Sequence, residues 1–577
     1  MPESLPIWDL TDLYTDSSTS IQQDLDTAKQ QTEKLVQYEG RLSQMTGAEL
    51  AAVIADYQSV SERLSRIISH ADLQFAADMA DPQTGQHAQG MKEAISGFSS
   101  QLMFIELELA TMDESGFQEA LSDPDFYHFL PWLRRLRAFA PHQLETRLEQ
   151  MLVERTPAGR GAWIRLFDET ATALRFAFQG TEVTEAEILN KLSEPSADIR
   201  KEAGQSLSGV MQDNQRLFCL ILNVIAKDKE IDDRWRGFSR PVSSRNLAND
   251  VDDATVDALV SAVTARMPDI AHRYYQLKAS WMGADELPWW DRNAPLPGDD
   301  DRRFNWSDAR RIVTDAFASF DQPMADVAQQ FFDRNWIDAE VRKGKASGAF
   351  SHPTVPSAHP YILMNFDGRA RDVMTLAHEM GHGIHQVLAA DKGYLMSDTP
   401  LTLAETASVF AEMLAFQTLV DKAPNDAARR FLLAGKVEDM LNTVVRQIAF
   451  HNFETAFHDA RKSGEVSAEA LSDLWMQTQT QALGPAVRLD DSYRPIWAYI
   501  PHFVHTPFYV YAYAFGDCLV NALWQNYQEK SAADKLVFSE QYIQLLKAGG
   551  TKRYDEALAP FSLNPADASF WNMGLDM

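Results

Sequence analysis

Residues 378–382 read His-Glu-Met-Gly-His, and this pattern constrains the chain more than any other feature of the sequence. His378 and His382 share one face only if the segment is an α-helix, where they lie about one turn apart. Both imidazoles then reach one metal ion at ~2.0–2.1 Å, the length of a zinc–nitrogen bond. Glu379 lies about 100° further round the helix, where it reaches a water molecule beside the metal rather than the metal itself. We predict a helix over about 371–391.

Glu405 and Glu412 lie in the next segment, where a mostly apolar stretch over 401–420 predicts a second helix. A buried carboxylate without a partner is costly, so a glutamate in such a helix requires one. The 22 residues between His382 and Glu405 are enough to end the first helix, turn, and bring the second alongside. We predict Glu405 as the third metal ligand, and Glu412 as the residue that orients a ligand histidine. The alternative is that both glutamates face solvent.

Two histidines and one glutamate form the ligand set of a catalytic rather than a structural zinc site, because the fourth position stays open to water. We therefore predict one Zn²⁺ per chain. The metal lowers the pKa of its water towards ~7, and Glu379 accepts the proton as a general base. For a His-Glu-x-x-His pattern this chemistry is hydrolysis of a peptide bond.

One further histidine lies in the first predicted helix, and two histidines and a glutamate form a separate cluster later in the chain. His385 follows His382 by three positions, and we predict that it packs beside the metal ligands without binding the metal. His451, Glu454 and His458 share one helix face, but the two histidines are about 10 Å apart along the axis, too far to bind one ion. We predict that this second cluster is a structural polar seam.

Residues 502–513 form an aromatic segment near the C-terminus. Tyr509 and Tyr513 are four positions apart, which predicts two phenols on one helix face. Two interpretations remain open. The stripe belongs to the core, or a phenolic O–H stabilises the oxyanion of a tetrahedral intermediate with the help of a histidine such as His502. Pro507 breaks the backbone so that the segment lines a cleft.

The composition excludes some partners. The 577 residues include 53 Lys+Arg and 82 Asp+Glu, a net charge of −29, which disfavours binding to nucleic acid or to an anionic membrane. We expect no run of ~18 apolar residues long enough to cross a membrane. The N-terminus has no basic region followed by an apolar one, and Cys219 and Cys518 are predicted to be free, buried thiols. These features predict a soluble, cytoplasmic protein.

Helical periodicity dominates the chain, so we predict a mostly α-helical fold with a small sheet near the metal-binding helix. The short apolar run over 361–366 predicts a strand. Thr184 and Glu187 form a capping box that opens a short helix, and Pro195 follows its end. We place a boundary there, between an N-terminal helical lobe at 1–195 and a catalytic domain at 196–577.

Taken together, these motifs resemble the oligoendopeptidase F branch of the thimet-oligopeptidase-like zinc metallopeptidases. The resemblance rests on WDLTDLY at 8–14, the loop at 344–348, NFDG at 365–368, LAHEMGHGIHQ at 376–386, the glutamate helix at 405–412 and IPHF at 500–503. It spans nearly the whole chain. It implies a helical, two-lobed protein with a deep central channel that admits short unstructured oligopeptides and excludes folded proteins.

The resemblance also implies roles for individual residues. His378, His382 and Glu405 would bind zinc, and Glu379 would be the base. The segment with His502, Tyr509, Tyr511 and Tyr513 would hold the substrate and the oxyanion, without indicating which tyrosine acts. The loop at 343–348, including Gly348, would bind and close over the substrate, and the strand at 361–366 would pair its edge with an extended peptide.

Three hypotheses about activity remain open. The first is a zinc endopeptidase that cleaves internal bonds of oligopeptides, as a monomer or homodimer. The second is a carboxypeptidase or dipeptidyl carboxypeptidase on a related scaffold, which needs a cation such as Arg494 or Lys345 to bind the terminal carboxylate. The third is a peptide-binding protein with a structural zinc, which the presence of Glu379 disfavours because a structural site needs no base.

Overall fold

The computed structural model describes residues 4–15, 17–296 and 302–577, and it is 72% helical with a few short strands. This confirms the predicted mostly α-helical fold class. The chain divides into two compact units, neither of which is one continuous stretch. Unit 1 comprises Met1–Ala140, Asp301–Lys422 and Leu523–Asn564, and unit 2 comprises Pro141–Asp300, Ala423–Ala522 and Pro565–Met577. The separation of a catalytic domain from residue 196 onward stays a prediction.

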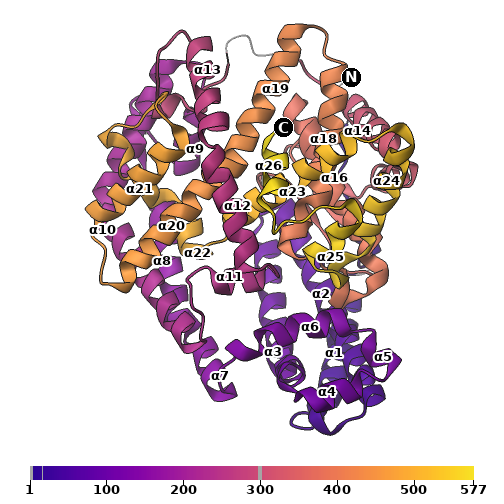
Figure 1. Ribbon diagram of the computed structural model, residues 1–577. Helices are drawn as coiled ribbons and strands as arrows, with labels where there is room; N and C mark the ends of the chain where they lie inside the picture. The colour runs from indigo at the N-terminus through magenta and orange to yellow at the C-terminus, as the bar shows by residue number, and fades with distance from the viewer. Residues whose placement is uncertain (1–3, 16, 297–301) are drawn as a thin grey trace. The chain divides into compact units, whose positions relative to one another are not determined.

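Unit 1 begins with helices that pack on one another, and its later segments include α16 and α18, the two helices of the predicted metal site (Figure 1). These segments also carry a small sheet. Its helices are α1 (Ser17–Val36), α2 (Gly47–Ala77), α3 (Pro82–Thr111), α4 (Glu114–Ala120), α5 (Pro124–Tyr127), α6 (Leu130–Phe139), α14 (Trp306–Phe320), α15 (Gln322–Asp333), α16 (Ala370–Ala389), α17 (Tyr394–Ser397), α18 (Leu401–Asp421), α24 (Ala532–Lys547) and α25 (Tyr554–Leu558).

A continuous apolar core joins the early helices of unit 1 to α17. Leu35 of α1, Ile54 of α2, Ile105 of α3 and Leu133 of α6 are fully buried in it, together with Met396 of α17. The segment that directly follows α16 is therefore fixed to helices more than 250 positions earlier in the chain. This packing holds the C-terminal end of α16 in place.

The sheet of unit 1 has three strands in the order β4 (Ile337–Asp338), β6 (Tyr361–Leu363) and β5 (Phe350–His352). β6 pairs parallel with β4 and antiparallel with β5, with Ser351 opposite Ile362. The predicted strand at 361–366 therefore exists, but it ends at Leu363. Because β6 is the central strand, its edges are already paired, and the prediction that it pairs with a peptide substrate is wrong.

α16 and α18 are neighbours in unit 1 and run beside each other in the region drawn in orange (Figure 1). Their bounds agree closely with the two predicted helices. After α16 a short 3-10 turn leads to Gly393, whose φ of 77° reverses the chain towards α17 and α18. A positive φ suits glycine because it has no Cβ.

α18 also has the length and hydropathy of a membrane-spanning helix over Thr402–Asp421. It is not an uninterrupted run of ~18 apolar residues, which the sequence was expected to lack, because Glu405 and Glu412 lie within it. Moreover, 72% of the stretch is buried inside the protein. Such burial is typical of a core helix, whose apolar faces contact neighbouring helices rather than lipid.

Unit 2 contains the remaining helices and two small pairs of strands. Its helices are α7 (Thr146–Arg155), α8 (Arg160–Ala173), α9 (Glu185–Lys191), α10 (Ala197–Trp235), α11 (Ser243–Ala248), α12 (Asp253–Arg266), α13 (Arg273–Trp281), α19 (Asp426–Met440), α20 (Arg446–Lys462), α21 (Ala468–Leu483), α22 (His502–His505) and α26 (Ala568–Leu575), with the unit boundary inside α23 (Tyr511–Gln528). The strands are β1 (Phe176–Phe178) paired with β2 (Thr181–Val183), and β3 (Leu287–Pro288) paired with β7 (Val487–Arg488). The capping box predicted at Thr184 and Glu187 is present at the start of α9.

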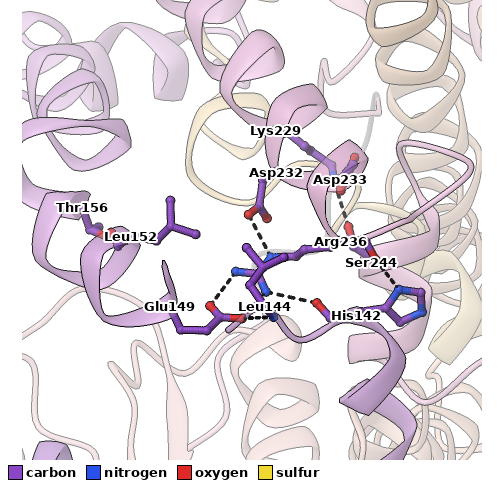
Figure 2. Close-up of polar contacts among 10 residues, drawn as sticks. All are labelled: His142, Leu144, Glu149, Leu152, Thr156, Lys229, Asp232, Asp233, Arg236 and Ser244. Atoms are coloured by element: carbon purple, nitrogen blue, oxygen red, sulfur yellow. Dashed lines mark hydrogen bonds and ion pairs between the residues drawn. The ribbon is translucent and has the colours of Figure 1, made fainter. Parts of the chain in front are cut away.

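A polar cluster fixes the C-terminal end of α10 to the chain around α7 (Figure 2). Arg236 donates two hydrogen bonds to the Glu149 carboxylate, at 2.6 and 2.9 Å, and another to Asp232 at 2.8 Å. A hydrogen bond from Arg236 also reaches the carbonyl of His142. The bidentate contact lowers the pKa of Glu149, as expected for a carboxylate held by a guanidinium fork.

Candidate metal centre and active site

α16 places the two histidines of the 378–382 motif on one face, as the helical spacing requires. Their ring centroids are 5.1 Å apart and the rings are nearly perpendicular. The His378 and His382 side chains keep 26% and 21% of their surface exposed, so their Nε2 atoms face an open site rather than the closed core. Glu379, on a different side of the helix, is buried.

α18 brings the Glu405 carboxylate to the two imidazoles. Its Oε2 atom lies 3.5 Å from Nε2 of His378 and 3.5 Å from Nε2 of His382. The donor atoms of the three residues lie within 4.8 Å of one another. Three ligands of a tetrahedral zinc ion at ~2.0–2.1 Å lie about 3.3 Å apart. The spacing therefore fits one metal ion held by two nitrogens and one oxygen.

Gly381 explains how α16 and α18 approach closely enough for this contact. A Cβ at this position would lie 2.5 Å from the carbonyl oxygen of Ala407 and 2.7 Å from Cα of Ser408. Only a residue without a side chain fits between the two helices here. A glycine inside a helix lowers its stability by about 1 kcal/mol relative to alanine. An interior glycine in a predicted helix therefore indicates, from the sequence alone, a position where another helix can pack closely.

Two residues of α18 support the predicted ligands. Glu412 accepts a hydrogen bond at Oε2 from Nδ1 of His378, at 3.2 Å, which is the contact predicted for it. Ser408, which sequence reasoning missed, donates to Oε2 of Glu405 at 2.6 Å. The hydrogen bond to Nδ1 leaves Nε2 of His378 as the nitrogen available to a metal.

The electrostatics of the site favour a bound cation. Burial opposes protonation of His378, but its hydrogen bond with Glu412 and the charges of Glu405 and Glu379 outweigh burial and raise its pKa to about 9. Burial raises the pKa of Glu379 to about 7, while the charge of His378 and the backbone of Ser351 oppose this shift. Three carboxyl groups thus surround two imidazoles, and a divalent ion would balance their charge.

His385 is buried one turn after the ligand pair, and its Nε2 lies 3.1 Å from the Thr399 hydroxyl. Burial, together with the charge of His382, lowers its pKa to about 4. His385 is therefore neutral and bonded to the segment that precedes α18. This position agrees with the predicted packing role, and the contact is with Thr399 rather than with a metal ligand.

In unit 2, the C-terminal segment brings His502, Tyr509 and Tyr513 together. Nε2 of His502 lies 3.3 Å from the Tyr513 hydroxyl, and its ring stacks on Tyr509 with centroids 6.3 Å apart. The two tyrosine rings are 5.2 Å apart. They do not share a helix, however, because α23 begins at Tyr511 and Tyr509 precedes it. The prediction of one helix face is wrong, since the chain turns at Pro507 and Phe508.

Tyr511 is fully buried, and its hydroxyl accepts a hydrogen bond from Nδ2 of Asn249 at 2.8 Å. A phenol with no exposed surface offers nothing to a peptide. The structure therefore argues against the predicted role of Tyr511 in substrate binding. The remaining phenols of this segment, Tyr509 and Tyr513, are only partly buried.

The polar seam on α20 supports the turn before α23. Oε1 of Glu454 accepts a hydrogen bond from the backbone N–H of Phe508 at 2.8 Å, and Phe508 adopts a φ of +61°. The rings of His451 and His458 pack on Phe508 with centroids 5.8 and 4.8 Å apart. The predicted structural role of this seam is consistent with these contacts.

The loop at 343–348 in unit 1 is bonded to its surroundings. The carbonyl of Gly344 accepts from the backbone of Met79, and Gly348, with a φ of +89°, accepts from Asn365. The side chain of Lys345 is fully buried, and its Nζ donates to Asp338 at 2.7 Å. These contacts do not support a mobile lid, and they remove Lys345 as a cation for a peptide carboxylate.

The fold and the metal centre together define the class of this chain. A mostly helical protein carries His-Glu-x-x-His on one helix. A glutamate of a neighbouring helix lies close enough to bind the same metal ion as the two histidines. This arrangement is that of a helical metallopeptidase with a catalytic metal site.

Comparison with known families gives the same result. The profile described as "Peptidase family M3" matches residues 314–577, and the one described as "Oligopeptidase F" matches residues 108–176. The chain belongs to peptidase family M3, in its oligopeptidase F branch. It is a metalloendopeptidase whose substrates are peptides.

Curated relatives match over nearly the full chain. Group B oligopeptidase PepB of Streptococcus agalactiae is 25% identical over 559 residues, which covers 94% of this chain and 90% of PepB. Oligopeptidase PepF of Bacillus subtilis is 24% identical over 566 residues, which covers 94% of this chain and 81% of PepF.

Solved structures share the fold. A candidate peptidase from Chlamydophila abortus superposes with a TM-score of 0.84 at 19% identity, covering 99% of this chain and 96% of its own. Oligoendopeptidase-F from Enterococcus faecium has a TM-score of 0.69 at 18% identity, covering 96% of this chain and 98% of its own. At such identities the likeness concerns the fold alone.

Proposed function

We propose that this chain hydrolyses internal bonds of short, unstructured oligopeptides with one Zn²⁺ bound by His378, His382 and Glu405. The observation that carries the proposal is the position of Glu405, whose Oε2 lies 3.5 Å from Nε2 of each histidine. The two histidines lie on one helix and the glutamate on another. The distances between the glutamate oxygen and the histidine nitrogens are therefore set by helix packing rather than by local sequence.

Zinc is the metal that best suits this ligand set. Two imidazole nitrogens and one carboxylate oxygen, with a fourth position left open, are typical of catalytic zinc. When bound, the ion polarises the scissile carbonyl as a Lewis acid and activates a water molecule. Glu412 holds the tautomer of His378 that presents Nε2, and Ser408 holds the Glu405 carboxylate.

Glu379 is the proposed proton carrier. Its carboxylate accepts a proton from the attacking water and then donates it to the leaving amine nitrogen. Burial raises its pKa to about 7 while no cation is bound, so its carboxylate is a stronger base than an exposed glutamate. The backbone of Ser351 in β5 contacts the carboxylate and fixes its direction.

His502, Tyr509 and Tyr513 are the proposed donors to the oxyanion that develops on the scissile carbonyl. Within unit 2 they form one contact group, in which the Tyr513 hydroxyl lies 3.3 Å from His502. Neutral phenol and imidazole donors stabilise developing negative charge when they are held in a fixed geometry. Gly348, which lies two positions before the start of β5, is the proposed contact for the substrate backbone.

The contacts of two cations weigh against the alternative hypothesis of a carboxypeptidase. Lys345 is buried with Asp338, and Arg494 donates to Asp473 at 2.5 Å. Neither is therefore available to bind a terminal carboxylate. We further propose a cytoplasmic location, since both cysteines are free and buried, as suits a reducing compartment.

The test combines metal analysis with digestion of a quenched peptide that is blocked at both ends. We expect about one zinc per chain, cleavage of an internal bond, loss of cleavage on chelation and recovery on adding zinc. Glu405→Ala should lose zinc, whereas Glu469→Ala, which removes an exposed carboxylate outside the site, should retain it. A blocked peptide that stays intact while the free peptide loses C-terminal residues would instead establish the carboxypeptidase.

A further inference from the structure

A small cavity in unit 2 lies between β3 and the segment that follows β7. Its walls include Trp289, Arg292, Tyr493 and Tyr499, all far from the metal ligands in sequence. The cavity measures about 30 Å³ for the centre of a water-sized sphere. That is room for one or two species of the size of a water molecule or a compact ion.

Four cationic side chains lie in the walls of this cavity or next to them, and two of them have carboxylate partners. Nζ of Lys278 donates to Glu438 at 2.5 Å, and Nε of Arg200 donates to Asp291 at 2.7 Å. These are paired charges of the kind that a protein interior accepts. They contribute no net charge to the cavity.

The other two cations, Arg292 and Arg446, have no carboxylate within ion-pair distance among residues 4–15, 17–296 and 302–577. Nη2 of Arg446 donates to the Tyr499 hydroxyl at 2.8 Å, while its Nε is buried without an acceptor. Nε of Arg292 has only a long contact of 3.4 Å with Asn293. Arg292 also forms a hydrogen bond with Tyr493, so Nε of Arg446 is the donor that is left without an acceptor.

The charges of both guanidinium groups affect the pKa of the same two tyrosines, Tyr275 and Tyr493. Burial raises the pKa of Tyr275 to about 12, and the charges of Arg292 and Arg446 oppose this shift. Burial likewise raises the pKa of Tyr493, again against both arginines. Arg292 and Arg446 thus place two positive charges beside one group of neutral hydroxyls.

We propose that Arg292 and Arg446 bind a compact monovalent anion in the cavity walled by Trp289, Tyr493 and Tyr499. Removing a charge from water is costly unless an opposite charge accompanies it. The chain has a net charge of −29, yet among the residues that the structure describes no carboxylate forms an ion pair with either arginine. Glu438, whose charge acts on Tyr275 together with theirs, is paired with Lys278 instead. Guanidinium and phenol donors suit a chloride ion or a single carboxylate group.

Two sources supply such an anion, namely a free ion such as chloride or the terminal carboxylate of a peptide. For the free ion, crystals of the full chain are soaked in sodium bromide, and anomalous scattering locates bromide. In solution, thermal unfolding is compared in sodium chloride and sodium gluconate at equal ionic strength. We expect bromide in the cavity and a higher midpoint in chloride, and we expect Arg292→Leu and Arg446→Leu each to lose the chloride effect.

Arg488→Gln is the matched control, because Arg488 also lies in unit 2 but is exposed and paired with Glu286 at 2.7 Å. It should retain the chloride effect. For the peptide source, binding of one peptide with a free or an amidated C-terminus is measured on Glu379→Gln protein, which avoids cleavage. A preference of on the order of tenfold for the free acid, lost in Arg446→Leu, assigns the site to the peptide carboxylate.

The proposal is overturned if no bromide occupies the cavity, chloride and gluconate give the same midpoint, and the two peptides bind equally. These readouts do not require turnover. A failure of the anion site is therefore distinguishable from a failure of the proposed peptidase mechanism.

Discussion

Glu454→Gln should make the free energy of unfolding of this protein less dependent on pH near neutrality. Glu454 is 1% exposed, its Oε1 accepts from the backbone of Phe508, and its Oε2 is buried without a partner. Burial raises its pKa to about 8, against the opposing effects of the Phe508 hydrogen bond and of Arg245 and Lys229. Near neutral pH the folded protein therefore holds this carboxyl group protonated, and glutamine replaces it with a neutral group of the same shape.

The sign and size follow from the two pKa values. An acid whose folded-state pKa is raised contributes stability below its unfolded-state pKa, here about 4.5, and loses it as pH rises through about 8. Each pH unit in this window corresponds to about 1.4 kcal/mol. Between pH 6 and pH 8 the wild type should lose about 2 kcal/mol relative to Glu454→Gln.

Urea unfolding, followed by tryptophan fluorescence at several pH values, measures this difference. Asp459→Asn is the control, since Asp459 is an exposed carboxylate on the same helix and its replacement leaves the buried cluster unchanged. The buried histidines His451 and His458 titrate in both proteins, so their effect cancels in the comparison. A difference between wild type and Glu454→Gln that stays constant from pH 6 to pH 8 would refute the reasoning.

Three further predictions concern the metal centre. Glu379→Gln should retain zinc while kcat falls by about 10²–10⁴-fold, which parallel metal analysis and peptide digestion would reveal; unchanged turnover contradicts the proposed base. Glu412→Ala should weaken zinc binding by about 10- to 100-fold, measured by competition with a chromogenic chelator, because His378 loses its Nδ1 acceptor; equal affinity would exclude that role. Gly381→Ala should cost about 1–3 kcal/mol and reduce zinc affinity, since its Cβ would lie 2.5 Å from the Ala407 carbonyl oxygen; a stable variant with full zinc content would disprove the close-approach argument.

Much of the fold and of the candidate site was predictable from the sequence. Helical spacing determines that His378 and His382 share a face, and the predicted span of 371–391 agrees with α16 at Ala370–Ala389. An apolar stretch that contains two glutamates predicted α18 and its partners, because buried carboxylates require them. Local rules of this kind depend only on neighbours within a few residues of each other.

The errors occur where the chain departs from regular structure. Tyr509 and Tyr513 have helical spacing, but a left-handed Phe508, held by Glu454 of a distant helix, delays the start of α23 to Tyr511. A glutamate 54 positions away determines this turn, so no local pattern predicts it. Likewise, the short run at 361–366 indicated a strand but not that both its edges would be paired.

The sequence by itself determined which side chains are able to bind a metal and which face of each helix presents them, because helical periodicity is a local property of the backbone. Only the tertiary structure decided that Glu405 meets the two histidines. That contact depends on α16 and α18 packing closely across Gly381, where even a Cβ would separate them. The distance between donor atoms on different helices is a result of packing, which no spacing along the chain specifies.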